Sequence, residues 1–311
     1  MRCSNPCCNR YRRKTMCVAT PTLYRGIQQN ILRLFSDLNK IQEKVSSGKN
    51  FNRPSDDPVA MVNSLGLSNT LERIGQYQKN MDTAKGWLDI NETVLDQVSN
   101  LAASAQNIAL QLSGGNQTAE VRTMAVSQID HLLDEAIDLG NTQLNGKYIF
   151  GGYQTATPPF ARSVSGGTET VNYQGDGNDL KIQIDPNQTI TAGKNGATVF
   201  MDSNLFSSLI ALKQAIANND QTAIQQESTN LQAATDYLNA QVSDVGIRQD
   251  HLKIQGEIFS QVNLDLQNQL GDLENVDNNK AIVEMQQKQT AYNVALETAA
   301  QISKVSLLDY L

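Results

Sequence analysis

The chain has 311 residues, of which 40% are hydrophobic and only 5% aromatic, and its formal net charge is −7. So few aromatic residues are typical of long packed helices rather than of a compact enzyme. The negative charge excludes an electrostatic footprint for nucleic acid, and no run of residues is long and apolar enough to predict a membrane span. We therefore expect a mainly helical protein that binds neither nucleic acid nor membrane.

The first fifteen residues differ from the rest of the chain. They hold several basic residues and no acidic one, and they include Cys3, Cys7 and Cys8. The spacing of these cysteines does not match a zinc site, because two are adjacent and no histidine is nearby. No apolar stretch follows the basic residues, which argues against a cleaved secretory signal. We expect residues 1–15 to be a disordered or non-native extension, with Met16 as the natural start.

A narrow apolar stripe predicts an N-terminal coiled-coil segment over residues 16–50. Apolar residues recur at alternating steps of four and three, which is the spacing of a coiled-coil seam. The stripe consists of Ile27, Ile31, Leu34, Leu38, Ile41 and Val45. Such a stripe gains little stability until another helix covers it. The helix is expected to end at Ser46–Gly48, with Gly48 as a left-handed cap.

A turn is predicted between this helix and the next. It consists of Arg53, Pro54, Ser55, Asp56, Asp57 and Pro58. The Asp57 carboxylate suits an N-cap, because it can accept hydrogen bonds from the free amides of the first helical turn. Pro58 fits the first helical position, where the amide hydrogen that proline lacks has no partner. Capping explains the adjacent acids, so we do not expect them to be a catalytic pair.

A helical trunk in two halves is predicted, over residues 51–144 and 202–276, with a small β-rich insert over residues 145–201 between them. The first half carries a sustained seven-residue repeat, which predicts one long helix from Pro58 to Leu112. A second helix opens at Thr118, with Val121 and Met124 on its inner side. The repeat consists of Leu67, Ile74, Met81, Leu88, Leu95, Ala102 and Ala109.

In the insert, four short strands are predicted where turn-forming residues separate short runs of strand-forming ones. They span residues 147–150, 171–174, 180–184 and 198–201, with Gly175–Asn178 as a hairpin turn. The second trunk half is expected to hold separate helices over about 203–218, 222–244 and 246–276. The last of these is expected to pair with the long helix of the first half.

Residues 277–311 are predicted to form a C-terminal coiled-coil segment. Steps of three and four recur there, although the seam is weaker because it includes Gln289. Its apolar members are Ile282, Met285, Tyr292, Leu296 and Ala299. The two terminal stripes are expected to pair with each other, with neighbouring copies of the chain, or both. We predict that they form an assembly interface.

No motif in the sequence indicates chemistry. The chain has no nucleophile motif, no phosphate-binding loop and no zinc spacing, and its two histidines, His131 and His251, lie far apart in polar helical settings. We therefore expect no enzymatic activity, no catalytic residues, no cofactor and no metal.

Three motifs in the same order resemble a known family. They are the Ser46–Pro58 turn, the run Gly146–Thr155 followed by Pro158-Pro159-Phe160, and the C-terminal run Ile302–Leu311. These motifs resemble the hook-associated protein 3 family, the hook–filament junction proteins of the bacterial flagellum, which are relatives of flagellin. The resemblance extends from about Met16 to the end of the chain.

The resemblance implies an elongated, flagellin-like helical bundle and a structural role outside the cell. Family members are exported by the flagellar type III apparatus without a cleaved signal, and a cytoplasmic chaperone holds the C-terminal segment beforehand. A ring of subunits then sits between the first hook-associated protein and the flagellin filament. The terminal helices are disordered in the monomer and form coiled coils on assembly.

Flagellin itself is the nearest alternative, because it shares the paired terminal helices. The Pro54–Pro58 turn and the ending Leu307–Leu311 favour the junction family. A coiled-coil signalling module ranks lower because the chain has no membrane segment. A carbohydrate-active enzyme with a helical stalk ranks lower because no acid pair converges.

Overall fold

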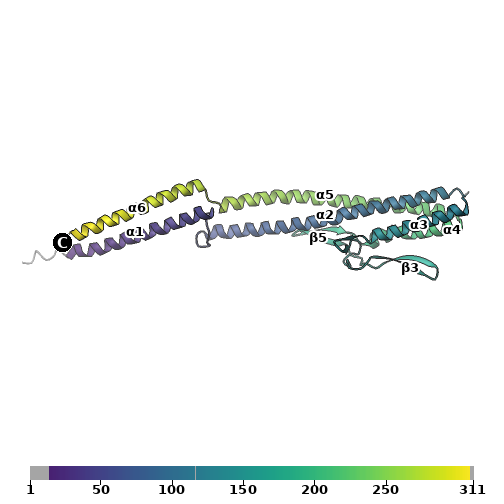
Figure 1. Cartoon of the computed structure of the whole chain (residues 1–311), viewed down its shortest axis with the longest axis horizontal. Helices are drawn as coiled ribbons and strands as arrows, with labels where there is room; N and C mark the ends of the chain where they lie inside the picture. The colour runs from purple at the N-terminus through teal and green to yellow at the C-terminus, as the bar shows by residue number, and fades with distance from the viewer. Residues whose placement is uncertain (1–13, 116, 309–311) are drawn as a thin grey trace, which may run out of the picture. The chain divides into compact units, whose positions relative to one another are not determined.

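The computed structural model describes residues 14–115 and 117–308 and is mainly helical with a small β-rich insert, which confirms the predicted fold class (Figure 1). The helices are α1 (Lys14–Ser47), α2 (Pro58–Leu112), α3 (Ala119–Gly140), α4 (Leu205–Asn218), α5 (Gln221–Glu274) and α6 (Asn278–Leu308). Residues 1–13 of the expected extension lie outside the described residues. Lys14 and Thr15 were expected in that extension, but they open α1 as helical residues.

The chain divides into two compact units. One combines the described residues up to Leu71 with those from Leu264, and the other spans Glu72–Asn263. Both boundaries fall inside long helices, because α2 and α5 continue unbroken past them. Each unit therefore contains a part of both helices.

In the larger unit, α2 and α5 run antiparallel. The rings of Tyr77 and Phe259 stack with their centroids 6.1 Å apart. Further along the pair, the Ser99 hydroxyl donates a hydrogen bond to the Asn239 side chain over 2.8 Å. The heptad positions of α2 form the buried face of the helix, with Leu88 only 1% exposed and Ala102 fully buried.

The predicted break before Gly246 is wrong, since α5 is one helix from Gln221 to Glu274. A single glycine costs a helix only about 1 kcal/mol relative to alanine. Burial of Val245 and Leu252, each 5% exposed, anchors α5 on both sides of Gly246. Tertiary packing therefore outweighs the local propensity at this position.

Helices α3 and α4 contribute a second apolar face to the larger unit. The Val121 amide donates to the Thr118 hydroxyl, so Thr118 caps α3 as predicted. Ile129 and Leu133 of α3 are fully buried, together with Leu212 of α4. Val121 and Met124 are 36% and 60% exposed, because they lie beside this face rather than on it.

The insert consists of three separate antiparallel strand pairs instead of one sheet. The pairs are β1 (Gln143–Leu144) with β2 (Lys147–Tyr148), β3 (Phe160–Ser165) with β4 (Thr168–Tyr173), and β5 (Leu180–Asp185) with β6 (Gln188–Gly193). The sequence did not predict β3 or β6. The strand predicted at residues 198–201 is instead part of a π-helix, η1 (Ala197–Met201), which buries Val199 and Phe200.

The predicted hairpin turn at Gly175–Asn178 is also wrong, because it connects β4 to β5 and these strands do not pair. The turn between β3 and β4 is Gly166–Gly167, with φ angles of +60° and +85°. Positive φ at both central residues is the geometry of a type I′ turn, which matches the twist of the flanking strands. The hairpin therefore turns where glycine removes the penalty for positive φ.

Phe160 fixes the base of the β3–β4 hairpin to the helices. Its backbone exchanges two hydrogen bonds of 3.0 Å with the side chain of Asn141, just after α3. Its ring leaves no room at two neighbouring glycines, since a Cβ at Gly140 or Gly196 would lie 2.6 Å from it. The hairpin base and the end of α3 therefore form one packed unit.

Candidate functional site

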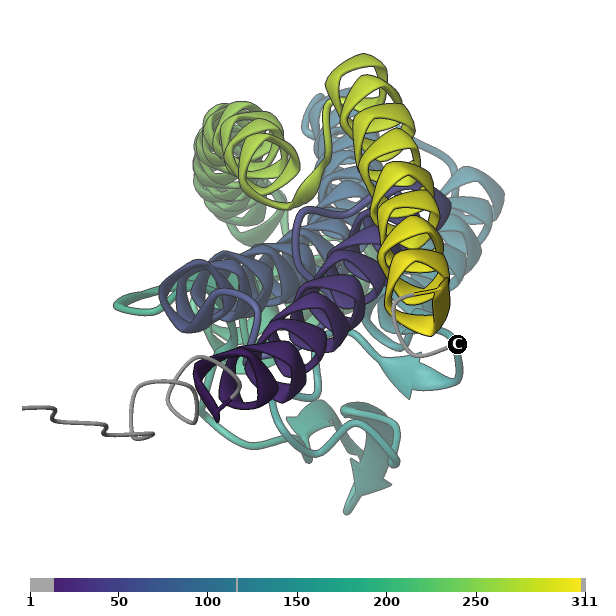
Figure 2. The same cartoon turned by 90° about the vertical axis from the view of Figure 1, so that its left-hand side faces the viewer.

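Helices α1 and α6 of the smaller unit lie side by side and run antiparallel (Figures 1 and 2). Their shared core contains Leu38, Ile41 and Ala281, which are 5%, 7% and 3% exposed. The rings of Phe35 and Tyr292 are 5.8 Å apart between centroids. The two terminal stripes are thus brought together within one chain, which is one of the two pairings that the sequence left open.

The α1 stripe faces α6 with a graded burial. Leu38 and Ile41 are buried, whereas Ile27, Ile31 and Leu34 are only half-buried. Coverage of the stripe is therefore most complete toward the C-terminal end of α1. The outer part of the stripe is left partly open to solvent.

The seam on α6 is shifted from the one that the sequence indicates. It consists of Ala281, Met285, Lys288, Tyr292, Ala295, Ala299 and Ile302. The predicted Met285, Tyr292 and Ala299 belong to it. Lys288 occupies a seam position because its ammonium pairs with Asp37 over 3.3 Å while its apolar stem lies along the helix. Apolar patterning alone therefore missed this register.

Ile282 and Leu296 lie beside the seam and are 40% and 41% exposed. They belong to a set of apolar side chains on α1 and α6 that the pair leaves exposed, which we call the outer apolar set. Its members are Leu23, Leu32, Phe35, Ile282, Val283, Val294 and Leu296. Isolated exposed apolar residues are common, but a group of this kind on two adjacent helices is typical of a contact surface.

The predicted turn before α2 is held by its acids. Asp57 Oδ1 accepts hydrogen bonds from the amides of Val59 and Ala60 over 3.1 and 2.9 Å, as an N-cap does. Asp56 Oδ2 accepts from the amides of Asn52 and Arg53 over 3.3 and 3.1 Å. Both carboxylates are therefore occupied in shaping the turn.

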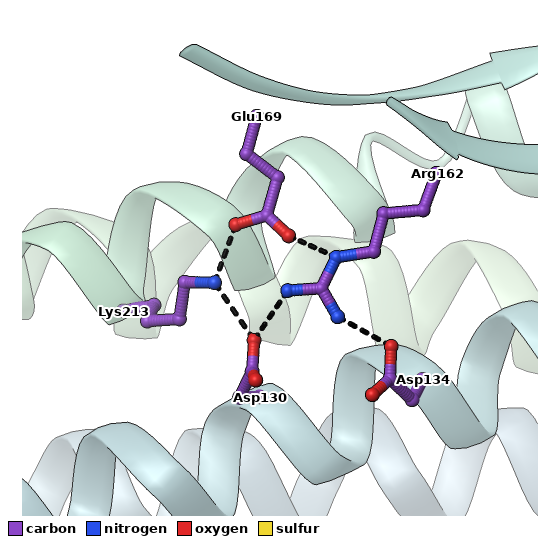
Figure 3. A network of polar contacts seen from close by, with 5 residues as sticks. All are labelled: Asp130, Asp134, Arg162, Glu169 and Lys213. Carbon is purple, nitrogen blue, oxygen red and sulfur yellow. Dashed lines mark hydrogen bonds and ion pairs between the residues drawn. The ribbon is translucent and has the colours of Figure 1, made fainter. Parts of the chain in front are cut away.

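A cluster of five charged residues is the arrangement in the larger unit that most resembles a chemical site (Figure 3). Arg162 of β3 pairs with Asp130 over 2.5 Å, and Lys213 of α4 reaches the same carboxylate over 2.7 Å. Arg162 also contacts Asp134, and Glu169 of β4 bridges Arg162 and Lys213. Each carboxylate has a cationic partner, so the cluster ties the β3–β4 hairpin to α3 and α4.

The pairing shifts the pKa values of the cluster. A hydrogen bond from Lys213, followed by one from Arg162, lowers the pKa of Asp130. Burial alone would lower the pKa of Lys213, but its hydrogen bonds to Asp130 and Glu169 outweigh burial and raise it. The tie therefore stabilises the folded chain between the acidic range of aspartate and the basic range of lysine.

Acidification is expected to weaken this tie. A carboxylate with a lowered pKa stabilises the fold above its unfolded pKa, and this contribution is lost as the pH falls through its folded pKa. At pH 7, Lys213→Met is expected to reduce the free energy of unfolding by on the order of 1 kcal/mol. This difference from wild type should shrink below about pH 4 in urea unfolding followed by circular dichroism.

Lys181→Met is the matched control, because Lys181 is exposed on β5 of the same insert. It is expected to leave the free energy of unfolding unchanged at both pH values. A loss for Lys213→Met that stays constant down to pH 3 would contradict the role of the Asp130 charge.

Neither histidine is part of this cluster or of the terminal pair. His131 on α3 and His251 on α5 are both exposed. Among the residues that the structure describes, no group of three or more potential ligands is arranged to hold a metal ion. Within the same residues, no helix combines the length and apolarity needed to cross a membrane.

Sequence reasoning did not identify Arg162, Glu169 and Lys213 as a group. They come from three different elements, and Lys213 is 83 residues from Asp130 in the sequence. No local spacing connects them. Only the packing of the hairpin on α3 and α4 brings them together.

Comparison with known proteins places both ends of the chain in families. The model for the bacterial flagellin N-terminal helical region matches residues 18–155, and that for the bacterial flagellin C-terminal helical region matches residues 229–311. These ranges include α1, most of the trunk helices and α6. The matches thus contain both helices of the terminal pair.

Similar proteins extend the comparison to the whole chain. The chain is 26% identical to flagellar hook-associated protein 3 of Escherichia coli, over 93% of this chain and 98% of that protein. Flagellin B of Helicobacter pylori is 29% identical, but over only 41% of this chain and 24% of that protein. The solved structure of a putative flagellar hook-associated protein from Vibrio parahaemolyticus has a TM-score of 0.64 at 22% identity, covering 71% of this chain and 100% of that chain.

Proposed function

Because the chain belongs to the bacterial flagellin family, we propose that it is a structural subunit of the flagellum that joins the hook to the filament. The observation that carries this proposal is the extent of the similarity to hook-associated protein 3, which includes 98% of the Escherichia coli protein. Similarity to flagellin B includes only 24% of that flagellin. A filament subunit is therefore the second candidate.

In this proposal the terminal helix pair is the assembly interface. Contact between α1 and α6 already covers Leu38 and Ile41. The outer apolar set is available to other subunits, and its burial would stabilise an assembly by roughly 25 cal/mol per Å² of apolar surface. Leu296 is a suitable probe of this surface, because it is exposed beside the α1–α6 seam.

The partners follow from the same role. A ring of copies would contact the first hook-associated protein on one side and flagellin on the other. Before assembly, a cytoplasmic chaperone would cover the C-terminal segment, which carries Val294 and Leu296 as exposed apolar residues. The protein would then act outside the cell after export without a cleaved signal.

Localisation of the protein distinguishes the two candidates. An epitope inserted at the exposed Gly166–Gly167 turn lies away from the terminal pair, in the other compact unit. Gold-labelled antibody is expected to mark one position on each flagellum, where the hook meets the filament. Label along the whole filament would identify a filament subunit, and absence of label from purified flagella with normal protein levels would overturn a flagellar role.

A further inference from the structure

The two linkers of the smaller unit are joined although they are far apart in the sequence. The Asn50 amide donates to the Glu274 carbonyl over 2.7 Å, and the Val276 amide donates to the Gly48 carbonyl over 2.9 Å. The Asn50 side chain donates to the Asn275 carbonyl over 2.8 Å, across 225 residues of sequence. These bonds connect the end of α1 directly to the start of α6.

The Glu274 carboxylate adds side-chain contacts at the same place. Lys49 Nζ lies 2.9 Å from Glu274 Oε2, and the Ser64 hydroxyl donates to Glu274 Oε1. Ser64 is 4% exposed and the Glu274 side chain 19%. The hydrogen bond from Ser64, followed by the one from Lys49, lowers the pKa of Glu274, so the carboxylate is charged at neutral pH. We call this joint the linker clasp, formed by Gly48, Lys49, Asn50, Ser64, Glu274, Asn275 and Val276.

Burial in the terminal pair falls with distance from the linker clasp. Leu38, Ile41 and Ala281, which lie near it in the sequence, are at most 7% exposed. Farther out, Ile27 and Ile31 are half-buried, and Leu23 is 53% exposed. Because an isolated helix depends on packing of its apolar face, the two parts of the pair differ in what stabilises them.

We propose that the linker clasp fixes the register of α1 against α6 and keeps the near half of the pair folded in the isolated chain. The near half consists of residues 35–47 and 278–292, and the far half of the remaining described residues of α1 and α6. Once the linkers are joined, further contacts between the helices close only short loops, so the entropy cost is small. The far half lacks such coverage and folds against neighbouring subunits, which is the one part that rests on the proposed function.

This assignment changes where order begins in the free protein. The family resemblance implies disorder of the whole terminal segments in the monomer. The linker clasp moves the boundary into the helices, near Leu34 on α1 and Tyr292 on α6. The isolated chain then presents a preformed, correctly registered helix pair to its partners.

Hydrogen exchange of the full-length isolated chain tests this directly. In wild type, amides of residues 38–47 and 281–288 are expected to exchange at least about tenfold more slowly than those of residues 22–33 and 293–302. Glu274→Gln removes the charge that Lys49 pairs with, and Asn50→Ala removes the side-chain bond to Asn275. Each variant is expected to reduce the protection of the near half by about tenfold.

Glu284→Gln is the matched control, because Glu284 is an exposed acid on α6 outside the linker clasp. Amides of residues 205–216 report whether the larger unit remains folded in every variant. Equal exchange of near and far halves in wild type would overturn the proposal, as would unchanged protection in both clasp variants. Strong protection of the far half in the isolated chain would overturn its dependence on neighbours. None of these results depends on where the protein is found on the flagellum.

Discussion

Leu296→Glu is expected to prevent the chain from entering the flagellum while leaving its own fold intact. Leu296 is 41% exposed and lies outside the α1–α6 seam, so a carboxylate there remains solvated in the isolated chain. In an assembly that covers this surface, the same charge would be buried without a partner, at a cost of several kcal/mol. Swimming motility and label at the hook end are expected to be lost, with an unchanged circular dichroism spectrum of the isolated chain.

Ala291→Glu is the control for the introduced charge. Ala291 is exposed and lies seven residues after Glu284, on the side of α6 that already carries a carboxylate. Motility is expected to be near normal for this variant. If Leu296→Glu assembles as well as Ala291→Glu, the outer apolar set is not an interface and only the α1–α6 contact uses the terminal stripes.

Phe160→Ala is expected to cause the largest loss of stability in the larger unit. Phe160 is 2% exposed, and its ring centroid lies 5.0 Å from that of Phe200 and 5.3 Å from those of Tyr173 and Phe206. Removing a buried phenylalanine ring typically costs 3–5 kcal/mol, because apolar contacts are lost and a cavity remains (roughly). Urea unfolding of the full-length chain measures this loss.

Val164→Ala on the same strand provides the comparison. Val164 is 68% exposed, so its truncation is expected to change the free energy of unfolding by less than about 0.5 kcal/mol. A loss below about 1 kcal/mol for Phe160→Ala would mean that the hairpin base collapses around the missing ring. The aromatic cluster would then not be what attaches the insert to the helices.

The long helices could be predicted from the sequence because their signals are local. The seven-residue repeat, the Asp57 cap and the Pro58 start define α2 from its first residue to its last. Gly246 misled the prediction of α5, because local propensity cannot register the burial of Val245 and Leu252. Helix boundaries were thus predicted well wherever capping, rather than tertiary packing, decides them.

The insert and the charged cluster depend on contacts between distant residues, and this is why the sequence did not predict them. Residues 198–201 have a strand-like composition, but burial of Val199 and Phe200 is achieved in a π-helix. Strand β3 was missed because only its partner β4 gives its polar residues a defined face. Lys288 concealed the α6 register, since a cation at a seam position is explained only once Asp37 is seen opposite it.

The separation of the insert into independent strand pairs makes the β3–β4 hairpin an adjustable element. It pairs with no other strand, and its tip at Gly166–Gly167 is exposed. Because side chains alternate with a period of two, adding two residues to each strand lengthens the hairpin without turning its buried face outward. Its anchors, Phe160 and the Arg162 charge cluster, stay where they are. Relatives of this chain can therefore vary the reach and chemistry of this projection in evolution while the helices that assemble remain under separate constraint.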